Sequence, residues 1–210
     1  MAGRPRRRED PAAGRERRAA VDDPAVVLEA AARFLEARAR SVVEVRRRLG
    51  RAGYRADLVE AAIGRLVQLG ILDDEAFGRA WVESRDRARP RGEMALRREL
   101  MLKGVDRAVV DELLEARRET AAAAAAASGS DLGVDGAGDH PDVAAARRVV
   151  ARHARALMRV ADPRARRQRA YAMLARNGFD ASICATVSAE AVRSAARPEE
   201  DVDLVEPEST

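Results

Sequence analysis

Apolar residues recur every three to four positions along most of the chain. The first stripe consists of Val27, Ala31, Phe34 and Leu35. This spacing puts side chains on one face of an α-helix, which turns by ~100° per residue, and no segment alternates as a half-buried strand would. The pattern therefore predicts an all-α protein, with stripes at residues 27–35, 42–52, 59–66, 72–84, 96–100, 109–114, 143–160, 170–174 and 183–187.

Residues that begin and end helices flank these stripes. Two Asp-Pro pairs, at residues 23–24 and 162–163, provide a cap followed by proline at the first helical position. Ser41 and Glu44 have the spacing of a capping box. Further caps are predicted at Asp57, Asp73, Asp106 and Asp180, and left-handed helix ends at Gly53, Gly70, Gly104 and Gly178.

One short pattern occurs three times. Leu49, Leu100 and Leu174 are each followed four residues later by glycine and then by an apolar or aromatic residue. Such self-similarity is typical of helical repeats, each of which buries too little apolar surface to be very stable alone. The sequence predicts three tandem three-helix repeats, which form an elongated, curved helical array, at residues 24–70, 71–119 and 141–194.

Three segments lie outside these repeats. Residues 1–23 are Arg-rich, lack apolar periodicity and are predicted to be a disordered extension. Residues 120–140 are predicted to be an Ala/Gly-rich linker, in which the alanines at 121–127 also suit an extension of the preceding helix. Residues 195–210 are predicted to be a disordered acidic tail.

Composition narrows the class of protein. The chain has 210 residues with 38 arginines, one lysine and 35 acidic residues, for a net charge of +4. No apolar run reaches the ~18–20 residues of a membrane span, and no apolar core follows the basic N-terminus as in a secretory signal. A single cysteine excludes an internal disulfide. We therefore expect a cytoplasmic protein with no membrane contact.

The charge is unevenly distributed. Residues 141–194 carry 11 arginines and four acidic residues, whereas residues 195–210 carry one arginine and six acidic residues. A basic body favours a polyanionic partner or a protein with an acidic surface. High arginine and alanine content also follows from a GC-rich coding sequence, so the arginine content by itself leaves both explanations open.

Three separated blocks resemble the RecX family. The first is the run from Arg38 to Leu49, the second the run from Gly70 to Val82 followed by Arg85, and the third the run from Gly92 to Val105. They occur in the family's order. The resemblance covers residues 24–119 and, more weakly, 141–194. The basic extension, the Ala/Gly insertion and the acidic tail depart from the family pattern.

The resemblance implies a non-catalytic regulator of the RecA recombinase, built from tandem three-helix repeats. As partners it implies RecA and its filament on single-stranded DNA, with inhibition of ATPase and strand exchange, and hence a role in DNA repair and the SOS response. Single- or double-stranded DNA is a further electrostatic partner. The expected state is a monomer without cofactor.

Little in the sequence suggests catalysis or metal binding. There are two histidines, His140 and His153, and neither has the spacing of a metal site. Cys184 occupies the repeat position of Val59 and Val110, which predicts burial as a small apolar side chain. Helix capping explains the acidic run at residues 73–75 better than a metal site does. We predict no catalytic, cofactor or metal residues.

The candidate binding residues are therefore basic. They follow the capping turn of each repeat and, with the repeats in register, would line one surface that follows a phosphodiester backbone or an acidic groove. For each residue the alternative is a solvated side chain balanced by nearby acids. The set is Arg46, Arg47, Arg48, Arg85, Arg87, Arg89, Arg91, Arg97, Arg98, Lys103, Arg164, Arg166, Arg167 and Arg169. Trp81 and Tyr54 have the chemistry to stack on bases, but their positions favour core packing.

Two other functions fit the same repeats. Short three-helix units with a glycine-containing turn also suit a helix-turn-helix DNA-binding protein, although the segment at residues 58–69 carries few side chains that read bases. The other alternative is a helical adaptor that binds proteins and no nucleic acid.

Overall fold

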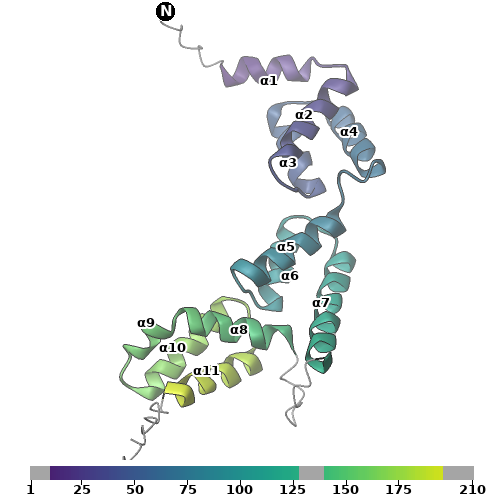
Figure 1. Ribbon diagram of the computed structural model, residues 1–210. Helices are drawn as coiled ribbons and strands as arrows, with labels where there is room; N and C mark the ends of the chain where they lie inside the picture. The colour runs from purple at the N-terminus through teal and green to yellow at the C-terminus, as the bar shows by residue number, and fades with distance from the viewer. Residues whose placement is uncertain (1–9, 128–139, 196–210) are drawn as a thin grey trace, which may run out of the picture. The chain divides into compact units, whose positions relative to one another are not determined.

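The computed structural model describes residues 10–127 and 140–195, and all regular secondary structure in these ranges is helical (Figure 1). This confirms the all-α prediction. The helices are α1 (Pro11–Ala19), α2 (Pro24–Glu36), α3 (Val42–Ala52), α4 (Ala56–Gln68), α5 (Asp74–Ala88), α6 (Glu93–Leu102), α7 (Arg107–Ala127), α8 (Pro141–Arg152), α9 (Ala154–Met158), α10 (Pro163–Arg176) and α11 (Ala181–Ala195).

The chain divides into two compact units. Unit 1 comprises Met1–Ser84 and Arg97–Glu115, and unit 2 comprises Arg85–Leu96 and Ala116–Thr210. The boundaries fall within α5, α6 and α7. The division into three repeats stays a prediction.

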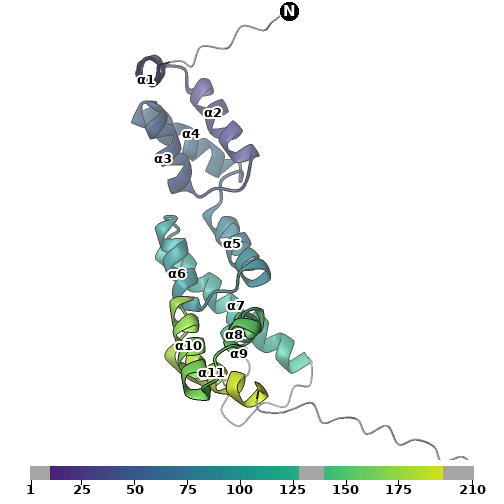
Figure 2. The ribbon, with the colours of Figure 1, turned by 90° about the vertical axis from the view of Figure 1, so that its left-hand side faces the viewer.

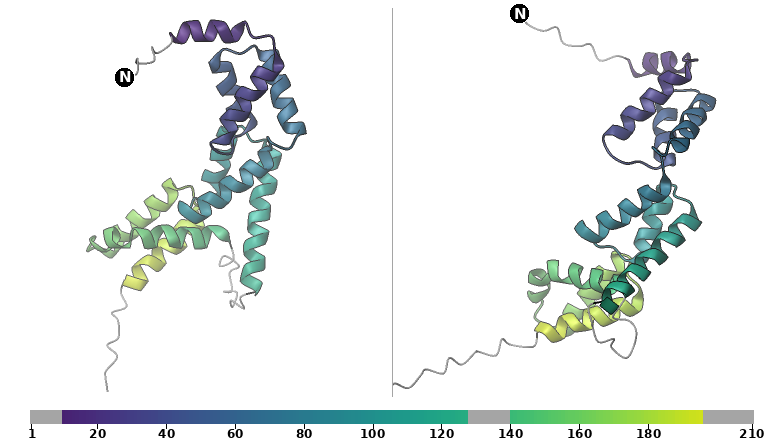
Figure 3. Two further views of the ribbon diagram at one scale, coloured as in Figure 1. Left: turned by 45° about the horizontal axis from the view of Figure 1, so that its top comes forward. Right: turned by 45° about the vertical axis from the view of Figure 1, so that its right-hand side comes forward.

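The core of unit 1 is formed by α2, α3 and α4, which pack against one another (Figure 3). Val27, Val45, Leu49 and Leu66 are at most 2% exposed. These residues belong to three of the predicted stripes, so the helical period correctly identified the buried face of each helix.

The N-terminal segment differs from the prediction of disorder over residues 1–23. Within that range the structure forms α1, whose first turn is capped by Asp10 and begins with proline. Arg18 donates from Nη1 to the carbonyl oxygen of Ala52 at 3.1 Å. An added Cβ on Gly53 would lie 2.9 Å from the carbonyl oxygen of Arg15. The helix thus packs through backbone contacts, which apolar periodicity does not reveal; residues 1–9 lie outside the described ranges.

Most predicted helix caps are present. Ser41 and Glu44 form the capping box, and the carboxylates of Asp23, Asp73, Asp106, Asp162 and Asp180 each accept a hydrogen bond from a backbone N–H of the following turn. Asp57 is the exception, because Arg55 is the N-cap and α4 begins at Ala56, two residues earlier than a cap at Asp57 would place it. Asp57 instead forms an ion pair with Arg55 at 2.6 Å.

The three Leu-x3-Gly turns have the same backbone hydrogen bonds. In each turn, the backbone N–H of the residue after glycine donates to the carbonyl oxygen of the leucine. The three bonds run from Tyr54 to Leu49 at 3.3 Å, from Val105 to Leu100 at 3.2 Å and from Phe179 to Leu174 at 3.4 Å. Each preceding glycine has a positive φ of 81–101°, which an L side chain rarely adopts. The sequence pattern therefore marks one helix-ending turn that occurs three times.

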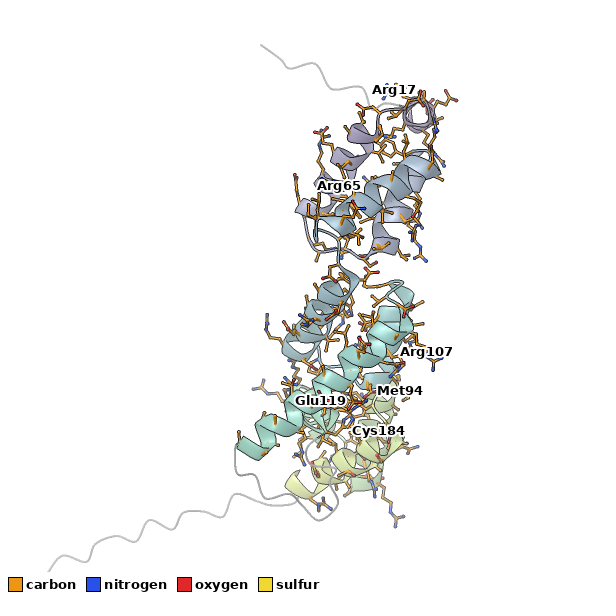
Figure 4. All side chains as sticks on the ribbon, turned by 90° about the vertical axis from the view of Figure 1, so that its right-hand side faces the viewer. Arg17, Arg65, Met94, Arg107, Glu119 and Cys184 are labelled. Atoms are coloured by element: carbon orange, nitrogen blue, oxygen red, sulfur yellow. The ribbon has the colours of Figure 1, made fainter. Side chains whose placement is uncertain are left out.

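The core of unit 2 lies between α8, α10 and α11, which pack together in Figures 1 and 2. Leu174, Phe179 and Cys184 are at most 1% exposed, which confirms the predicted burial of the cysteine. Figure 4 shows Cys184 among the helices of this unit. The stripe predicted at residues 143–160 is divided between α8 and α9 at His153, whose backbone leaves the helical conformation.

The segments predicted as linker and tail lie partly outside the description. The alanines at residues 121–127 belong to α7, which resolves their ambiguity in favour of helix extension. Residues 128–139 and 196–210 lie outside the described ranges. No helix in residues 10–127 or 140–195 has the length and apolar character needed to cross a membrane.

Candidate functional site

Within the part of the chain that the structure describes, the positive charge is concentrated in unit 2. Among the described residues, unit 2 has 17 arginines and seven acidic residues, whereas unit 1 has 17 basic and 18 acidic residues. A field of several kT around one unit attracts polyanions to that unit. The candidate residues of unit 1 and those of unit 2 therefore lie in different charge environments.

Half of the candidate residues in unit 1 are paired with carboxylates. Arg46 of α3 forms a two-pronged pair with Glu60 of α4, and Arg97 of α6 pairs with Asp111 of α7. The ammonium group of Lys103 lies 2.9 Å from Glu44 and 4.3 Å from the centre of the Trp81 ring. These contacts stabilise the packing of unit 1.

The other three candidates in unit 1 are exposed. Arg47 and Arg98 have no carboxylate partner among the residues that the structure describes. The guanidinium of Arg48 lies 5.7 Å from the centre of the Phe34 ring. Arg47 and Arg98 are therefore the unit 1 residues most able to reach a partner without breaking an internal contact.

Trp81 and Tyr54 are both partly buried. The indole N–H of Trp81 donates to Glu99 at 2.9 Å, and its ring lies 6.0 Å from that of Phe77. Tyr54 packs against the core of unit 1. These positions agree with the packing role expected for both rings.

Lys103 gives a prediction about stability. Burial raises the pKa of Glu44, but hydrogen bonds from Lys103 and Arg38 outweigh this effect and hold the pKa below its ordinary value. We expect Lys103→Met to lower the free energy of unfolding of unit 1 by about 1–2 kcal/mol at pH 7. Urea denaturation followed by Trp81 fluorescence measures this change.

The pH dependence identifies the cause. Because the pKa of Glu44 is lowered on folding, the stabilisation is complete above the unfolded pKa of about 4.3 and is lost as the pH falls through the folded value. The loss caused by Lys103→Met should therefore shrink below pH 4. The control Arg98→Met removes an exposed charge and should change stability by less than about 0.5 kcal/mol. Equal effects of the two variants would contradict this assignment.

In unit 2, four candidates lie at the end of α5 and in the link to α6. Arg87 and Arg89 are exposed, whereas Arg85 and Arg91 are half-buried. The link is held against the turn between α10 and α11, because the N–H of Gly92 donates to the carbonyl oxygen of Asn177 at 3.1 Å. The guanidinium of Arg91 also donates to the side-chain oxygen of Asn177.

The C-terminal end of α5 is also contacted by two arginines that the sequence analysis did not identify. From α8, Arg148 donates to the carbonyl oxygen of Asp86 and Arg152 to that of Ala88, both at 2.7 Å. These carbonyls lie in the last turn of α5, where a helix carries partial negative charge. The four-residue spacing of Arg148 and Arg152 puts them on one face of α8 and was the available signal.

The remaining candidates lie at the start of α10. Arg164, Arg167 and Arg169 are exposed, and Arg166 donates from Nε to the carbonyl oxygen of Val160 at 3.1 Å. Asn177, which holds the α5–α6 link, comes 13 residues after Arg164. A rise of 1.5 Å per residue separates these points by about 20 Å along the axis. The α10 group and the α5–α6 group are thus at opposite ends of one helix.

Acidic side chains near the end of α5 are already paired. Arg117 of α7 binds Asp86 with two hydrogen bonds, at 2.8 and 2.9 Å, and Asp142 of α8 at 2.6 Å. Burial lowers the pKa of Arg117, but hydrogen bonds to both carboxylates outweigh it and raise the pKa. Arg117 thus remains charged, and it neutralises two carboxylates that would otherwise repel an anion.

The described residues give no indication of a metal centre. No three His, Cys, Asp or Glu side chains in the described ranges come together in a way that would hold an ion. Within the predicted acidic run, Asp73 caps α5, Asp74 accepts from the N–H of Val42 at 2.8 Å, and Glu75 pairs with Arg79. The chemistry available at the surface is that of guanidinium groups, which bind carboxylates and phosphates.

Comparison with known families finds two matches within the chain. Residues 28–66 match the first three-helix domain of the RecX family, and residues 73–114 match the second. These ranges contain the first and third of the three sequence blocks and most of the second. The comparison confirms the resemblance to the RecX family.

Relatives in bacteria support the same assignment. The chain is 44% identical over 82 residues to the regulatory protein RecX of Mycolicibacterium vanbaalenii, covering 39% of this chain and 45% of that protein. It is 39% identical over 85 residues to the regulatory protein RecX of Pelodictyon phaeoclathratiforme, covering 40% and 53%. The matched part thus spans about half the length of these relatives.

Solved structures share the fold. The crystal structure of RecX from Lactobacillus salivarius aligns with a TM-score of 0.62 at 18% identity, over 81% of this chain and 97% of that one. A second crystal structure, of a regulatory protein RecX, aligns with a TM-score of 0.61 at 17% identity, over 79% and 71%. The likeness therefore extends beyond the residues that match by sequence.

Proposed function

Residues 28–66 and 73–114 match the first and second three-helix domains of the RecX family, and from this match we propose that the chain is a non-catalytic regulator of the RecA recombinase. It binds RecA or the RecA filament on single-stranded DNA, and it inhibits ATPase and strand exchange. The relatives are named as regulatory proteins, which supports a regulatory role. Its place of action is the cytoplasm, and it acts as a monomer.

The single observation that carries the binding mode is the charge of unit 2. An excess of ten positive charges among its described residues suits a nucleoprotein filament, whose DNA is a dense polyanion. Arg87, Arg89 and Arg164 are exposed there and contact no carboxylate within the described ranges. We assign contacts with DNA or with acidic protein surface to unit 2, and contacts through Arg47 and Arg98 to unit 1.

The helix-turn-helix alternative has less support. A recognition helix that enters the major groove needs side chains that donate to base edges and few carboxylates. The exposed residues of α4 include Asp57 and Glu60, and Glu60 holds Arg46 in an ion pair. This face suits protein packing better than base reading.

The test is a titration of RecA's DNA-dependent ATPase with this protein. We expect inhibition near stoichiometric amounts, reduced at least five-fold in potency by combined Arg47→Glu, Arg89→Glu and Arg98→Glu changes, since charge reversal in a contact repels the partner. Unchanged ATPase and unchanged filament length at stoichiometric amounts would contradict the proposed function.

A matched control separates specific contacts from net charge. Arg65, labelled in Figure 4, is exposed on α4 and has no carboxylate partner in the described ranges. Arg65→Glu changes the net charge by the same amount as Arg47→Glu, Arg89→Glu or Arg98→Glu alone. It should leave the potency of ATPase inhibition within two-fold of that of the original protein. An equal loss of inhibitory potency for every charge reversal would show that net charge, and not the position of the arginine, determines the effect.

A further inference from the structure

Unit 2 contains a small hollow whose lining includes three arginines, Arg89, Arg91 and Arg152. Its volume is about 210 Å³, and it lies between the α5–α6 link, the end of α8 and the end of α10. The side chains with charge or hydrogen-bonding capacity in its lining are those of Arg89, Arg91, Arg152, His153 and Asn177. A tetrahedral anion has the size and chemistry to fit such a place.

The link side of the hollow is fixed by close backbone packing. An added Cβ on Gly92 would lie 2.2 Å from the carbonyl oxygen of Gly178, so the two backbones are in direct contact. Asn177 accepts from the N–H of Gly92 and from Arg91, and its amide donates to the carbonyl oxygen of Met173 at 2.8 Å. Arg89 therefore extends from a segment whose backbone position is set.

The α8 side is fixed by the end of that helix. Arg152 donates to the carbonyl oxygen of Ala88 at 2.7 Å, which joins α8 to the last turn of α5. His153 follows as the residue that ends α8, and its Nδ1 lies 2.9 Å from the carbonyl oxygen of Val149. Because a carbonyl only accepts, Nδ1 carries the proton in this contact, which holds the ring at the end of α8.

The charge around the hollow favours an anion. No carboxylate lines it, and Asp86, the acidic residue nearest in sequence to Arg89, is bound by two hydrogen bonds from Arg117. The Arg89 side chain has no hydrogen bond or ion pair among the described residues. Fixed, concave positive charge with planar guanidinium donors is typical of phosphate recognition.

We propose that this hollow is a phosphate-binding site that takes one phosphodiester group of a single-stranded nucleic acid. Arg89 supplies the contact that is made only when the ligand is bound, while Arg91, Arg152 and Asn177 are held in place by the protein. Only the origin of the single strand depends on the proposed function, because the RecA filament would supply that strand. Phosphate binding itself is tested without RecA.

The first measurement is fluorescence anisotropy with a labelled 20-nucleotide single strand and the full chain, over a series of salt concentrations. We expect Arg89→Gln to weaken binding about ten-fold and to lower the slope of log K against log salt by about one, as for the loss of one phosphate contact. Arg193→Gln is the control, because Arg193 is an exposed arginine of unit 2 on α11, outside the hollow. It should change affinity less than two-fold.

The second measurement locates the ligand. In amide NMR spectra, the single strand should shift the signals of Gly92, His153 and Asn177 in the original protein and not in Arg89→Gln. Inorganic phosphate at millimolar concentration should shift the same signals. Shifts with the strand but not with inorganic phosphate would identify the phosphodiester backbone of the nucleic acid as the ligand. Equal losses for Arg89→Gln and Arg193→Gln, or signals unmoved by both probes, would overturn the site.

The two proposals fail separately. If Arg89→Gln weakens strand binding while the original protein leaves RecA's ATPase unchanged, the phosphate site stands and the proposed function does not. If the protein inhibits RecA and Arg89→Gln binds the strand normally, the proposed function stands and the hollow is no phosphate site.

Discussion

Replacing Arg117 by methionine should lower the free energy of unfolding of unit 2 by about 3–5 kcal/mol, because it leaves two carboxylates without their partner. The Arg117 side chain is 7% exposed and that of Asp142 is 2% exposed. Asp142 has a second role, since its other oxygen accepts from the N–H of Glu93 at the start of α6 at 2.7 Å. Removing Arg117 therefore strands a buried charge at a point where four helices meet.

Amide hydrogen exchange of α8 and α10 measures this loss for unit 2 alone. Arg107→Met is the control on the same helix, because the Arg107 side chain is 82% exposed and extends from α7 in Figure 4. It should cost less than about 0.5 kcal/mol. A loss for Arg117→Met that matches the control would show that the buried pairs contribute little.

A double-mutant cycle sharpens the assignment. With Asp142→Asn the stranded charge is absent, so adding Arg117→Met should cost clearly less than it does in the original protein. Additive losses would mean that Arg117 acts through packing alone.

Gly92→Ala should destabilise unit 2 by about 3 kcal/mol or more, which is the upper range for an added methyl group in a packed site. The new Cβ would lie 2.2 Å from the carbonyl oxygen of Gly178 and 2.4 Å from the backbone nitrogen of Phe179. Neither atom belongs to a flexible side chain, so the link or the α10–α11 turn must move. The same exchange measurement reports the change.

The control for this variant is Gly64→Ala in the middle of α4. Apart from the adjacent backbone of α4 itself, no atom lies within 4 Å of the added Cβ there. Alanine favours a helix interior over glycine by roughly 0.5–1 kcal/mol, so this variant should be more stable than the original. A destabilised Gly64→Ala, or an unaffected Gly92→Ala, would contradict the packing described here.

Local signals in the sequence predicted most of the helical elements. Ser41 and Glu44 form the expected capping box, and the three leucine–glycine turns have matching hydrogen bonds. Cys184 is buried as its position in the repeat indicated. These features depend on residues within a few positions of each other, so the sequence contains what is needed to infer them.

The candidate surface was harder to infer. Arg117 and Arg118 are adjacent in a charged helix, yet Arg117 is nearly fully buried and Arg118 is one-third exposed. Arg148 and Arg152 escaped notice because their partners are carbonyl groups more than 60 residues away. Helix α1 was missed for a similar reason, since Arg18 binds the backbone of Ala52.

The sequence by itself determined the helical class, the turns that end helices, the apolar faces and the family resemblance, because these follow from short-range backbone chemistry and periodicity. Only the tertiary structure decided which arginines are paired, buried or free. A guanidinium is equally charged at every position, and its role depends on which carboxylates and carbonyls reach it through space. Among the described residues, the fold sets unit boundaries within α5, α6 and α7, and these boundaries leave unit 1 with nearly balanced charge and unit 2 with an excess of ten positive charges.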